Sequence, residues 1–271
     1  MGYLNGLKRI KYKDYLIYYA RDADHKAQVL IEGLLNTPII EKKGRGGIRI
    51  IDLGDKQVVC RRYIHGGLFR AITGDCFFSE GRVMDELKTL IHLKKAGFPV
   101  VEPYGAIIKR EGLIKRLYIL TCYVKDGVDL LDYLIKTVRR RDRLRLIKRL
   151  AYYMFELERL GIYHPDIHLK NIMVTPSNEM IFLDFDRASL KRMIRAKDRE
   201  RMLWRMNRFV EKMEKREGLK IYPMEKALFL REYERLSGEE ITNRMKRTIR
   251  YRRLISEVGW SIEKTLYRDS T

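Results

Sequence analysis

Residues 163–186 constrain the fold more than any other part of the sequence. They read YHPDIHLKNIMVTPSNEMIFLDFD and place two aspartate-centred clusters at the ends of a short apolar pattern. The apolar runs at 172–175 and 180–185, joined by the turn residues PSN, predict two strands that bring Asp184 back beside Asn171. Carboxylates set in apolar, strand-flanked sequence are costly to bury without a metal ion or another cation. The segment therefore predicts a loop and a hairpin that carry a polar site.

The residue types in this segment suit transfer of a γ-phosphoryl group. Asp166 can accept or orient a hydroxyl proton. Asn171 offers an amide oxygen to a hard cation such as Mg²⁺, and Asp184 can bridge that metal to the phosphates. A second interpretation is a metal-dependent hydrolase, whose ligand set would be His164, Asp166, His168, Asp184 and Asp186. The sequence upstream favours the first interpretation, because such a hydrolase would not need the features found there.

Three upstream features match the remaining parts of a phosphotransfer site. The glycine cluster Gly44, Gly46 and Gly47 could let the backbone approach phosphates, although such a cluster is also typical of a plain hairpin turn. Arg61 ends the apolar strand QVVCR, where a cation would face the phosphates of a nucleotide. Glu86 lies on a predicted helix and could pair with Arg61 to orient it. These residues are the predicted nucleotide-binding half of the site.

Hydrophobic patterns predict a β-rich half followed by a helical half. Strands are expected at 15–20, on both sides of a turn at Gly54 within 48–63, and at 116–124. Helices are expected at 79–96, 129–138 and 142–160 and throughout the basic segment after 188. Ser79 is expected to cap the helix at 79–96, and Gly97 to end it. This order of elements suggests two lobes that share a cleft.

The chain carries a large excess of positive charge. Its 271 residues include 57 Lys and Arg against 36 Asp and Glu, which gives a formal net charge of +21. Such an excess implies an anionic partner, which could be a nucleic acid, an anionic membrane surface or a phosphorylated substrate. The basic run KTVRRRDRLRLIKR at 136–149 contributes to it. Aromatic residues do not recur in a stacking pattern, which disfavours nucleic acid as the partner.

Cysteine usage and hydropathy predict a soluble or membrane-peripheral protein. The three cysteines form no C-x-x-C pair, which favours a reducing compartment and disfavours a disulfide framework or a zinc site. The first residues lack the apolar segment and small-residue site of a signal peptide. No stretch of about 18 apolar residues is present, so no membrane-spanning segment is expected.

Taken together, these motifs resemble the protein-kinase-like fold. They are most similar to the bacterial lipopolysaccharide-core kinase family, whose members phosphorylate Kdo or heptose. The segments GRGG, VVCRRYIHGGL, GFPVVEPYGA, GIYHPDIHLKNIMV and FLDFDRA look like the Kdo kinase branch. The resemblance runs from about residue 40 to about residue 215, and Arg61 in place of the lysine usual in protein kinases also favours this branch.

The resemblance implies an α+β, two-lobed fold and a set of roles. The N-lobe would be residues 1–122, β-rich with one key helix, and the C-lobe residues 123–271, largely helical. Asp166 would be the catalytic base, and Asn171 and Asp184 would bind Mg²⁺. ATP would be bound by Gly44, Gly46, Gly47, Arg61 and Glu86, with His164, His168, Lys170 and Asp186 in supporting positions.

Departures from the protein-kinase pattern bear on the acceptor. Asp186 replaces the final glycine of the metal-binding triplet and is expected to pair with Arg187. His168 stands where protein kinases have a lysine, and no A-P-E motif follows. The implied enzyme is therefore an ATP-dependent phosphotransferase with an alcohol group as acceptor, acting on Kdo of a lipid A precursor. It would work as a peripheral protein on the cytoplasmic face of the bacterial inner membrane.

Several alternatives remain open at this point. Within the same family the acceptor could be a heptose, and a small atypical protein kinase would also lack the A-P-E motif. A basic nucleic-acid-binding protein is the alternative from outside the enzymes. A pseudokinase scaffold is disfavoured because Asp166, Asn171 and Asp184 are all present. The sequence makes no prediction about oligomeric state.

Overall fold

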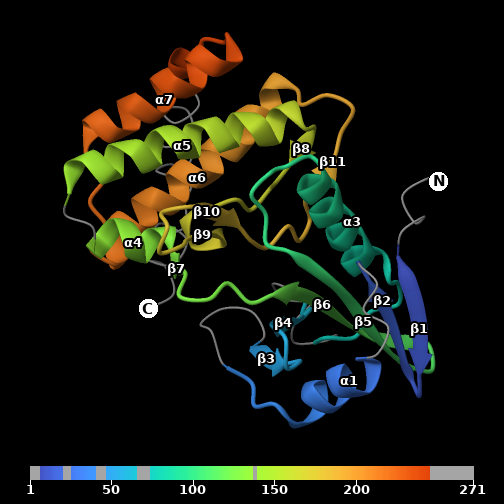
Figure 1. Cartoon of the computed structure of the whole chain (residues 1–271). Coiled ribbons are helices and arrows are strands. Elements are labelled where there is room, and N and C mark those ends of the chain that lie inside the picture. Colours follow the sequence, from blue (N-terminus) through green and yellow to red (C-terminus); the bar gives the residue numbers. More distant parts are fainter. Residues whose placement is uncertain (1–6, 21–25, 41–46, 66–73, 137–138, 245–271) are drawn as a thin grey trace, which may run out of the picture. The chain divides into compact units, whose positions relative to one another are not determined.

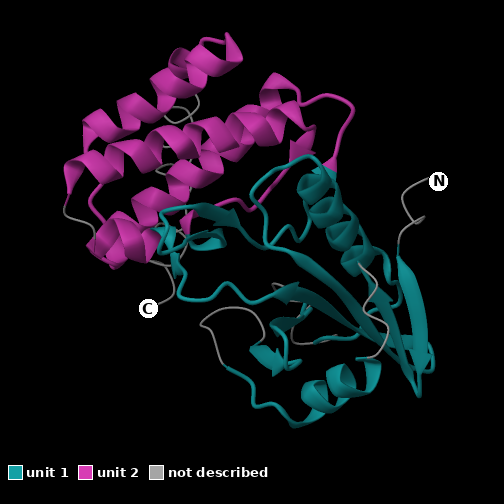
Figure 2. Cartoon of the chain, viewed as in Figure 1, with its two compact units in different colours: residues 1–130, 170–189 teal, residues 131–169, 190–271 magenta. Residues whose placement is uncertain are grey.

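The computed structural model describes residues 7–20, 26–40, 47–65, 74–136 and 139–244, and it contains both strands and helices. The chain forms two compact units (Figure 1 and Figure 2). Unit 1 comprises residues 1–130 and 170–189, and unit 2 comprises residues 131–169 and 190–271. The expected boundary between residues 122 and 123 stays a prediction, because the two units interleave along the chain.

Unit 1 is built on an antiparallel six-stranded sheet with the order β1-β2-β5-β6-β4-β3. Its strands are β1 (Lys8–Tyr12), β2 (Tyr15–Tyr19), β3 (Ile48–Asp52), β4 (Gln57–Arg62), β5 (Pro103–Glu111) and β6 (Ile114–Cys122). The expected strands at 15–20 and 116–124 and the pair around Gly54 are therefore confirmed. Gly54 has a φ of +85°, a conformation that glycine adopts without the strain a side chain would cause.

Two helices cover opposite faces of this sheet (Figure 1). Alternate residues of a strand face opposite sides, so each strand serves two apolar layers. On one face α1 (Ala27–Asn36) packs Leu30, Ile31 and Leu34 into a core that contains Val58 and Cys60 of β4. No motif in the sequence predicted α1 or the addition of β1 to the sheet.

The other face carries α3 (Gly81–Lys95), the helix expected at 79–96. Its residues Val83, Leu87 and Leu90 are fully buried, which confirms most of the predicted apolar stripe. The prediction of Ser79 as N-cap was wrong. Glu80 occupies the cap position without a side-chain cap bond, and the Ser79 hydroxyl instead accepts a hydrogen bond from the Gly81 amide at 3.1 Å.

A second, three-stranded sheet carries the predicted hairpin. It consists of β7 (Val128–Asp129), β9 (Ile172–Val174) and β10 (Met180–Phe182), with β9 in the centre. The second strand of the hairpin ends at Phe182 rather than at the expected residue 185. The backbone leaves the extended region there, since Asp184 has a φ of +54°.

Unit 2 is mainly helical. It contains α4 (Leu130–Lys136, with Leu130 at the unit boundary), α5 (Arg140–Arg159), α6 (Ala196–Arg216) and α7 (Pro223–Ser237). Of the short elements, β8 (Ile162–Tyr163) belongs to unit 2, whereas the 3₁₀ turn η1 (Leu169–Asn171) and β11 (Ser189–Leu190) each include residues of both units. The helix expected at 129–138 is confirmed within its described residues, and the helix expected at 142–160 is confirmed. The basic helical segment after 188 is confirmed as far as residue 244, and its remainder lies outside the described residues. Gly161, with a φ of +72°, follows the end of α5 as expected.

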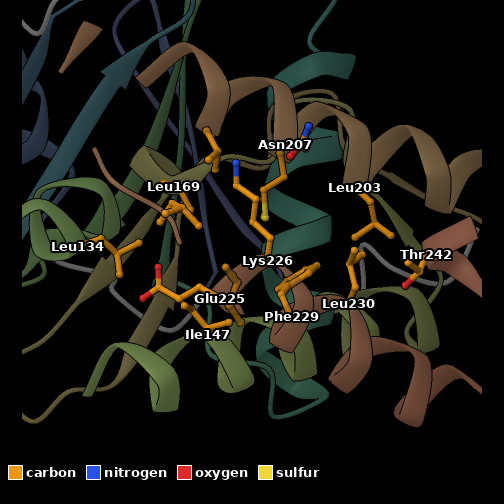
Figure 3. A pocket seen from close by; sticks show the side chains of 14 residues that line it. Leu134, Ile147, Leu169, Leu203, Asn207, Glu225, Lys226, Phe229, Leu230 and Thr242 are labelled. Carbon is orange, nitrogen blue, oxygen red and sulfur yellow. The ribbon is translucent and has the colours of Figure 1, made fainter. Parts of the chain in front are cut away.

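The core of unit 2 lies among its long helices and contains a small apolar cavity of about 150 Å³ (Figure 3). Leucine and isoleucine side chains from α4, α5, α6 and α7 line it, with Asn207, Glu225, Lys226 and Thr242 as its polar members. None of the predicted catalytic or metal-binding residues lines this cavity. It is part of the packing of the helices of unit 2.

One residue of the basic run at 136–149 belongs to this core. Arg143 is buried, and its Nε and Nη2 donate to the two carboxylate oxygens of Glu225 at 2.7 and 2.9 Å. Its guanidinium also donates to the carbonyl oxygens of Leu134 and Lys220. Burial by itself raises the pKa of Glu225, but the hydrogen bonds from Arg143 and from the Tyr222 amide, together with the Arg143 charge, outweigh burial and lower that pKa. Arg143 therefore fixes α4, α5 and α7 together and does not offer its charge to an anionic partner.

None of the described helices has both the length and the apolar character that crossing a bilayer requires.

Candidate active site

The pair predicted between Arg61 and Glu86 is confirmed. Val58 and Cys60 of β4 face α1, so Arg61 projects from the opposite side of the strand, toward α3. Its Nη2 donates to both carboxylate oxygens of Glu86, at 2.7 and 2.8 Å. The Glu86 side chain is 2% exposed and that of Arg61 is 23% exposed. The pair is therefore a buried, directly hydrogen-bonded cation and carboxylate.

Tyr63 completes this cluster. It lies two residues after Arg61, and its hydroxyl donates to Glu86 Oε2. The guanidinium carbons of Arg61 and Arg82 lie 4.9 and 5.0 Å from the centre of the Tyr63 ring, within the range of cation–π attraction. Burial raises the pKa of the Tyr63 hydroxyl well above its usual value, with the Glu86 charge acting in the same direction.

Neighbouring charges and burial have opposite effects on the pKa values of Arg61 and Glu86. Burial by itself lowers the pKa of Arg61, but the charges of Glu86 and Asp184 outweigh it and raise that pKa well above its usual value. Burial raises the pKa of the Glu86 carboxyl, against the opposing charge of Arg61. The cluster therefore holds one firmly protonated cation at a fixed position, at a cost in desolvation.

The hairpin brings Asp184 beside Asn171 as predicted. The amide of Leu183 donates to the carbonyl oxygen of Asn171 at 2.8 Å, directly before Asp184. The Asp184 carboxylate lies 3.2 Å from Arg61 Nη2, and its side chain is 35% exposed. Oxygen donors and a fixed cation are thus gathered in unit 1, with one carboxylate open to solvent.

The predicted partner of Asp186 was wrong. Asp186 is bound by Arg82 of α3, whose Nε donates to Oδ1 at 2.8 Å and whose Nη2 donates to Oδ2. Arg187, the expected partner, has a φ of +65° and an exposed side chain. Burial by itself raises the pKa of Asp186, but the hydrogen bonds and charge of Arg82 outweigh it and lower that pKa. Phe185, fully buried between the two aspartates, anchors the same turn.

In unit 2, the loop that carries Asp166 is held at three points. His164 is buried, and its Nδ1 accepts a hydrogen bond from the Asp166 amide at 3.3 Å. The Asp166 carboxylate accepts two hydrogen bonds from Arg205 of α6, from Nε at 2.9 Å and from Nη2 at 2.5 Å. The His168 ring stacks on Phe209 of α6, with 4.5 Å between ring centres. Sequence reasoning missed both Arg205 and Phe209.

The remaining predicted residues are less informative. Lys170 is exposed on η1. Gly44 and Gly46 lie outside the described residues. Gly47 begins the approach to β3, where a Cβ would lie 1.8 Å from Cγ2 of Ile39, so a larger residue would require the Ile39 side chain to move. Whether these glycines approach phosphates stays a prediction.

The alternative ligand set for a metal-dependent hydrolase is divided between the units, with His164, Asp166 and His168 in unit 2 and Asp184 and Asp186 in unit 1. Within the described ranges, no group of three or more His, Cys, Asp or Glu side chains could hold a metal ion. All five residues of that alternative set lie in those ranges. The two predicted Mg²⁺ ligands, Asn171 and Asp184, both lie in unit 1 and carry oxygen donors, the type of ligand that Mg²⁺ prefers.

The chain is similar to known proteins over most of its length. The family model described as "Lipopolysaccharide kinase (Kdo/WaaP) family" matches residues 32–233, which is more than half of the chain. The match includes the whole of the hairpin, α3, β4 and α6.

Curated relatives carry the name 3-deoxy-D-manno-octulosonic acid kinase. The one from Vibrio cholerae serotype O1 is 28% identical over 148 residues, which is 53% of this chain and 62% of the relative. The one from Xanthomonas oryzae pv. oryzae is 28% identical over 178 residues, or 64% of this chain and 70% of the relative. One from Xylella fastidiosa is 29% identical over 178 residues, with the same shares. The similarity thus spans about three fifths of the Vibrio relative's length.

Proposed function

The chain belongs to the lipopolysaccharide kinase (Kdo/WaaP) family, and from that membership we propose that it is an ATP-dependent sugar kinase. Its acceptor would be a hydroxyl of 3-deoxy-D-manno-octulosonic acid (Kdo) in a glycolipid of the lipopolysaccharide inner core. The relatives' printed name supports this choice of sugar. The observation that carries the proposal is the cluster of Arg61, Glu86 and Asp184 in unit 1.

That cluster supplies a fixed positive charge for the phosphates of a nucleoside triphosphate. Arg61 presents a guanidinium whose position is fixed by Glu86 and whose charge is firmly held. A cation held in place before the ligand arrives costs no reorganisation when the phosphates bind. We assign Arg61 to the phosphates of ATP, Glu86 to the orientation of Arg61, and the glycines at 44, 46 and 47 to the loop over the phosphates.

Asn171 and Asp184 are the proposed ligands of Mg²⁺. They fit the ion because both offer hard oxygen donors from neighbouring positions of the hairpin. When bound, Mg²⁺ would neutralise charge on the β- and γ-phosphate oxygens. The partly exposed Asp184 carboxylate can reach such an ion from the solvent side.

Asp166 is the proposed catalytic base. In the reaction, the acceptor hydroxyl oxygen forms a bond to the γ-phosphorus, and the bond from that phosphorus to the β,γ-bridging oxygen breaks as ADP leaves. The hydroxyl proton passes to the Asp166 carboxylate. His164 supports this role because its buried ring fixes the backbone at Asp166.

Positive charge supports an anionic glycolipid as the acceptor and an anionic membrane surface as its site. Within the basic run, the described side chains of Lys136, Arg139, Arg140, Arg141, Arg145 and Lys148 are exposed. Each Lys or Arg side chain near an anionic membrane surface contributes about 1 kcal/mol to the free energy of binding. A peripheral position on the cytoplasmic face of the inner membrane is therefore part of the proposal.

An acceptor panel tests the function. The purified full chain is incubated with Mg²⁺ and γ-labelled ATP, and transfer is measured to Kdo-lipid IVA, a heptose-bearing core fragment, an aminoglycoside and a protein mixture. We expect labelling of the Kdo acceptor that is lost in Asp166→Ala. Labelling of the heptose acceptor alone would move the chain to a heptose kinase, and labelling of protein alone would make it a protein kinase.

A further inference from the structure

Asp166 is already bound to a cation within unit 2. Arg205 Nε and Nη2 both donate to a single carboxylate oxygen, Asp166 Oδ1. The Arg205 side chain is 41% exposed and that of Asp166 is 24% exposed. One oxygen of the Asp166 carboxylate is therefore engaged by Arg205 before any acceptor binds.

The hydrogen-bond geometry of the Arg205–Asp166 pair is less favourable than that of the Arg143–Glu225 pair in the same unit. Arg143 binds Glu225 side by side, with Nε on one oxygen and Nη2 on the other, and both side chains are at most 7% exposed. Arg205 offers the same two donors, but both converge on one oxygen. A carboxylate that approached Arg205 side by side would make the better, bidentate pair.

Exposure makes the Arg205 pair exchangeable. Solvent-exposed ion pairs are worth about 0–1 kcal/mol, so another anion can displace Asp166 at little cost. The neighbouring arginines Arg201 and Arg208 are exposed on the same helix and add to the positive field. An incoming anion would therefore meet a partly exposed guanidinium next to the proposed base.

We propose that Arg205 is the residue that binds the carboxylate of the acceptor sugar. This rests on the proposed function, in which the acceptor is an octulosonic acid and so carries one carboxylate beside its hydroxyls. On binding, the acceptor carboxylate takes the place of Asp166 on Arg205, and the released Asp166 accepts the proton of the acceptor hydroxyl. Phe209, one turn further along α6, stacks on His168 and keeps the loop in position during the exchange.

The test compares two acceptors with two forms of the full-length protein. The acceptors are Kdo-lipid IVA and the same glycolipid with the Kdo carboxylate converted to its methyl ester. Wild type should use the free acid about 10–100-fold better in kcat/KM, as expected for loss of a charge-assisted hydrogen bond. Arg205→Gln should use the two acceptors about equally, with the change in the KM for acceptor and not in the KM for ATP.

Two further variants separate this role from a structural one. Arg216→Gln removes the same charge from an exposed site three turns further along α6 and should keep the wild-type preference for the acid. Arg205→Lys keeps the charge but cannot make the bidentate hydrogen bonds of a guanidinium. It should therefore recover part of the preference for the free acid that Arg205→Gln loses.

The outcomes distinguish the two proposals. If Arg205→Gln transfers phosphate and still prefers the acid as strongly as wild type, the role of Arg205 is wrong while the kinase function stands. If wild type transfers no phosphate to either acceptor, both proposals fail. Should Arg205→Gln be inactive, titration of the acid and the ester into each protein without ATP gives the same comparison from binding alone.

Discussion

Two arginine–carboxylate pairs, one in each unit, differ in burial and therefore suit different roles. In unit 1, Arg61 binds Glu86, which is 2% exposed and also accepts a hydrogen bond from Tyr63. In unit 2, Arg205 binds Asp166 through one oxygen, and both side chains are partly exposed. The first pair is fixed and suits a cation that must be in place before ATP binds. In the second pair Asp166 can be replaced by another anion, which suits the proposed role of Arg205 in binding the acceptor.

The largest expected effect comes from removing the base of the exchangeable pair. Asp166→Asn keeps the shape of the side chain but cannot accept the hydroxyl proton. We expect kcat for transfer to fall by about 10²–10⁴-fold, the usual contribution of a general base. Initial rates at saturating Mg-ATP and acceptor measure this. Asp142→Asn, a partly exposed aspartate of α5, is the control and should leave the rate unchanged.

Breaking the fixed pair should lower stability as well as activity. Glu86→Ala leaves the Arg61 guanidinium and the Tyr63 hydroxyl without their shared buried partner. We expect the free energy of unfolding to fall by about 3–5 kcal/mol, and the KM for ATP to rise in the protein that remains folded. Urea titration followed by circular dichroism measures the first effect.

The matched control for that change is Glu232→Ala in α7. Glu232 pairs with Arg235, whose side chain is 65% exposed. Removal of such a pair should cost less than about 1 kcal/mol. Equal losses at Glu86 and Glu232 would show that burial does not separate the two kinds of pair.

Replacement of Asp186 should have a smaller effect on the free energy of unfolding, and that effect should depend on pH. Hydrogen bonds from Arg82 lower its pKa in the folded protein despite the opposing effect of burial. The contribution of the charged form to stability is therefore complete above the unfolded-state pKa of about 3.9 and is lost as the pH falls through the lower folded-state pKa. At pH 7, Asp186→Asn should be about 1.5–3 kcal/mol less stable than wild type.

This difference should shrink as unfolding is measured at successively lower pH below about 4. A difference that stays constant down to pH 3 would mean that the charge of Asp186 contributes nothing through Arg82. The measurement thus tests the electrostatic part of the unit 1 cluster without reference to activity.

Sequence patterns predicted the parts of the site that lie in motifs or on regular elements. Arg61 and Glu86 were paired correctly because a strand end and a helix face gave both residues a direction. Arg82 could have been found in the same way, since it lies one turn before Glu86 on α3. The pairing of Asp186 with Arg187 failed because Arg82, which lies 104 residues earlier in the chain, binds both carboxylate oxygens of Asp186.

Contacts between distant segments could not be predicted. Arg205 lies 39 residues after Asp166, and nothing near it in sequence distinguishes it from the other arginines of α6. Arg143 was one base among eight in its run, and only the packing of α5 against α7 shows that it is buried against Glu225. The first strand and α1 carry no chemical motif, so their place in the sheet of unit 1 follows from the structure alone.

Mass analysis of the reaction product tests the central claim most directly. Wild type and Asp166→Asn are each incubated with Kdo-lipid IVA, ATP and Mg²⁺, and the glycolipid is recovered and fragmented in a mass spectrometer. With wild type, we predict a gain of one phosphate located on the Kdo residue, dependent on Mg²⁺ and absent with the variant. A glycolipid of unchanged mass, with ATP consumed or untouched, would contradict the assignment of this chain as a Kdo kinase.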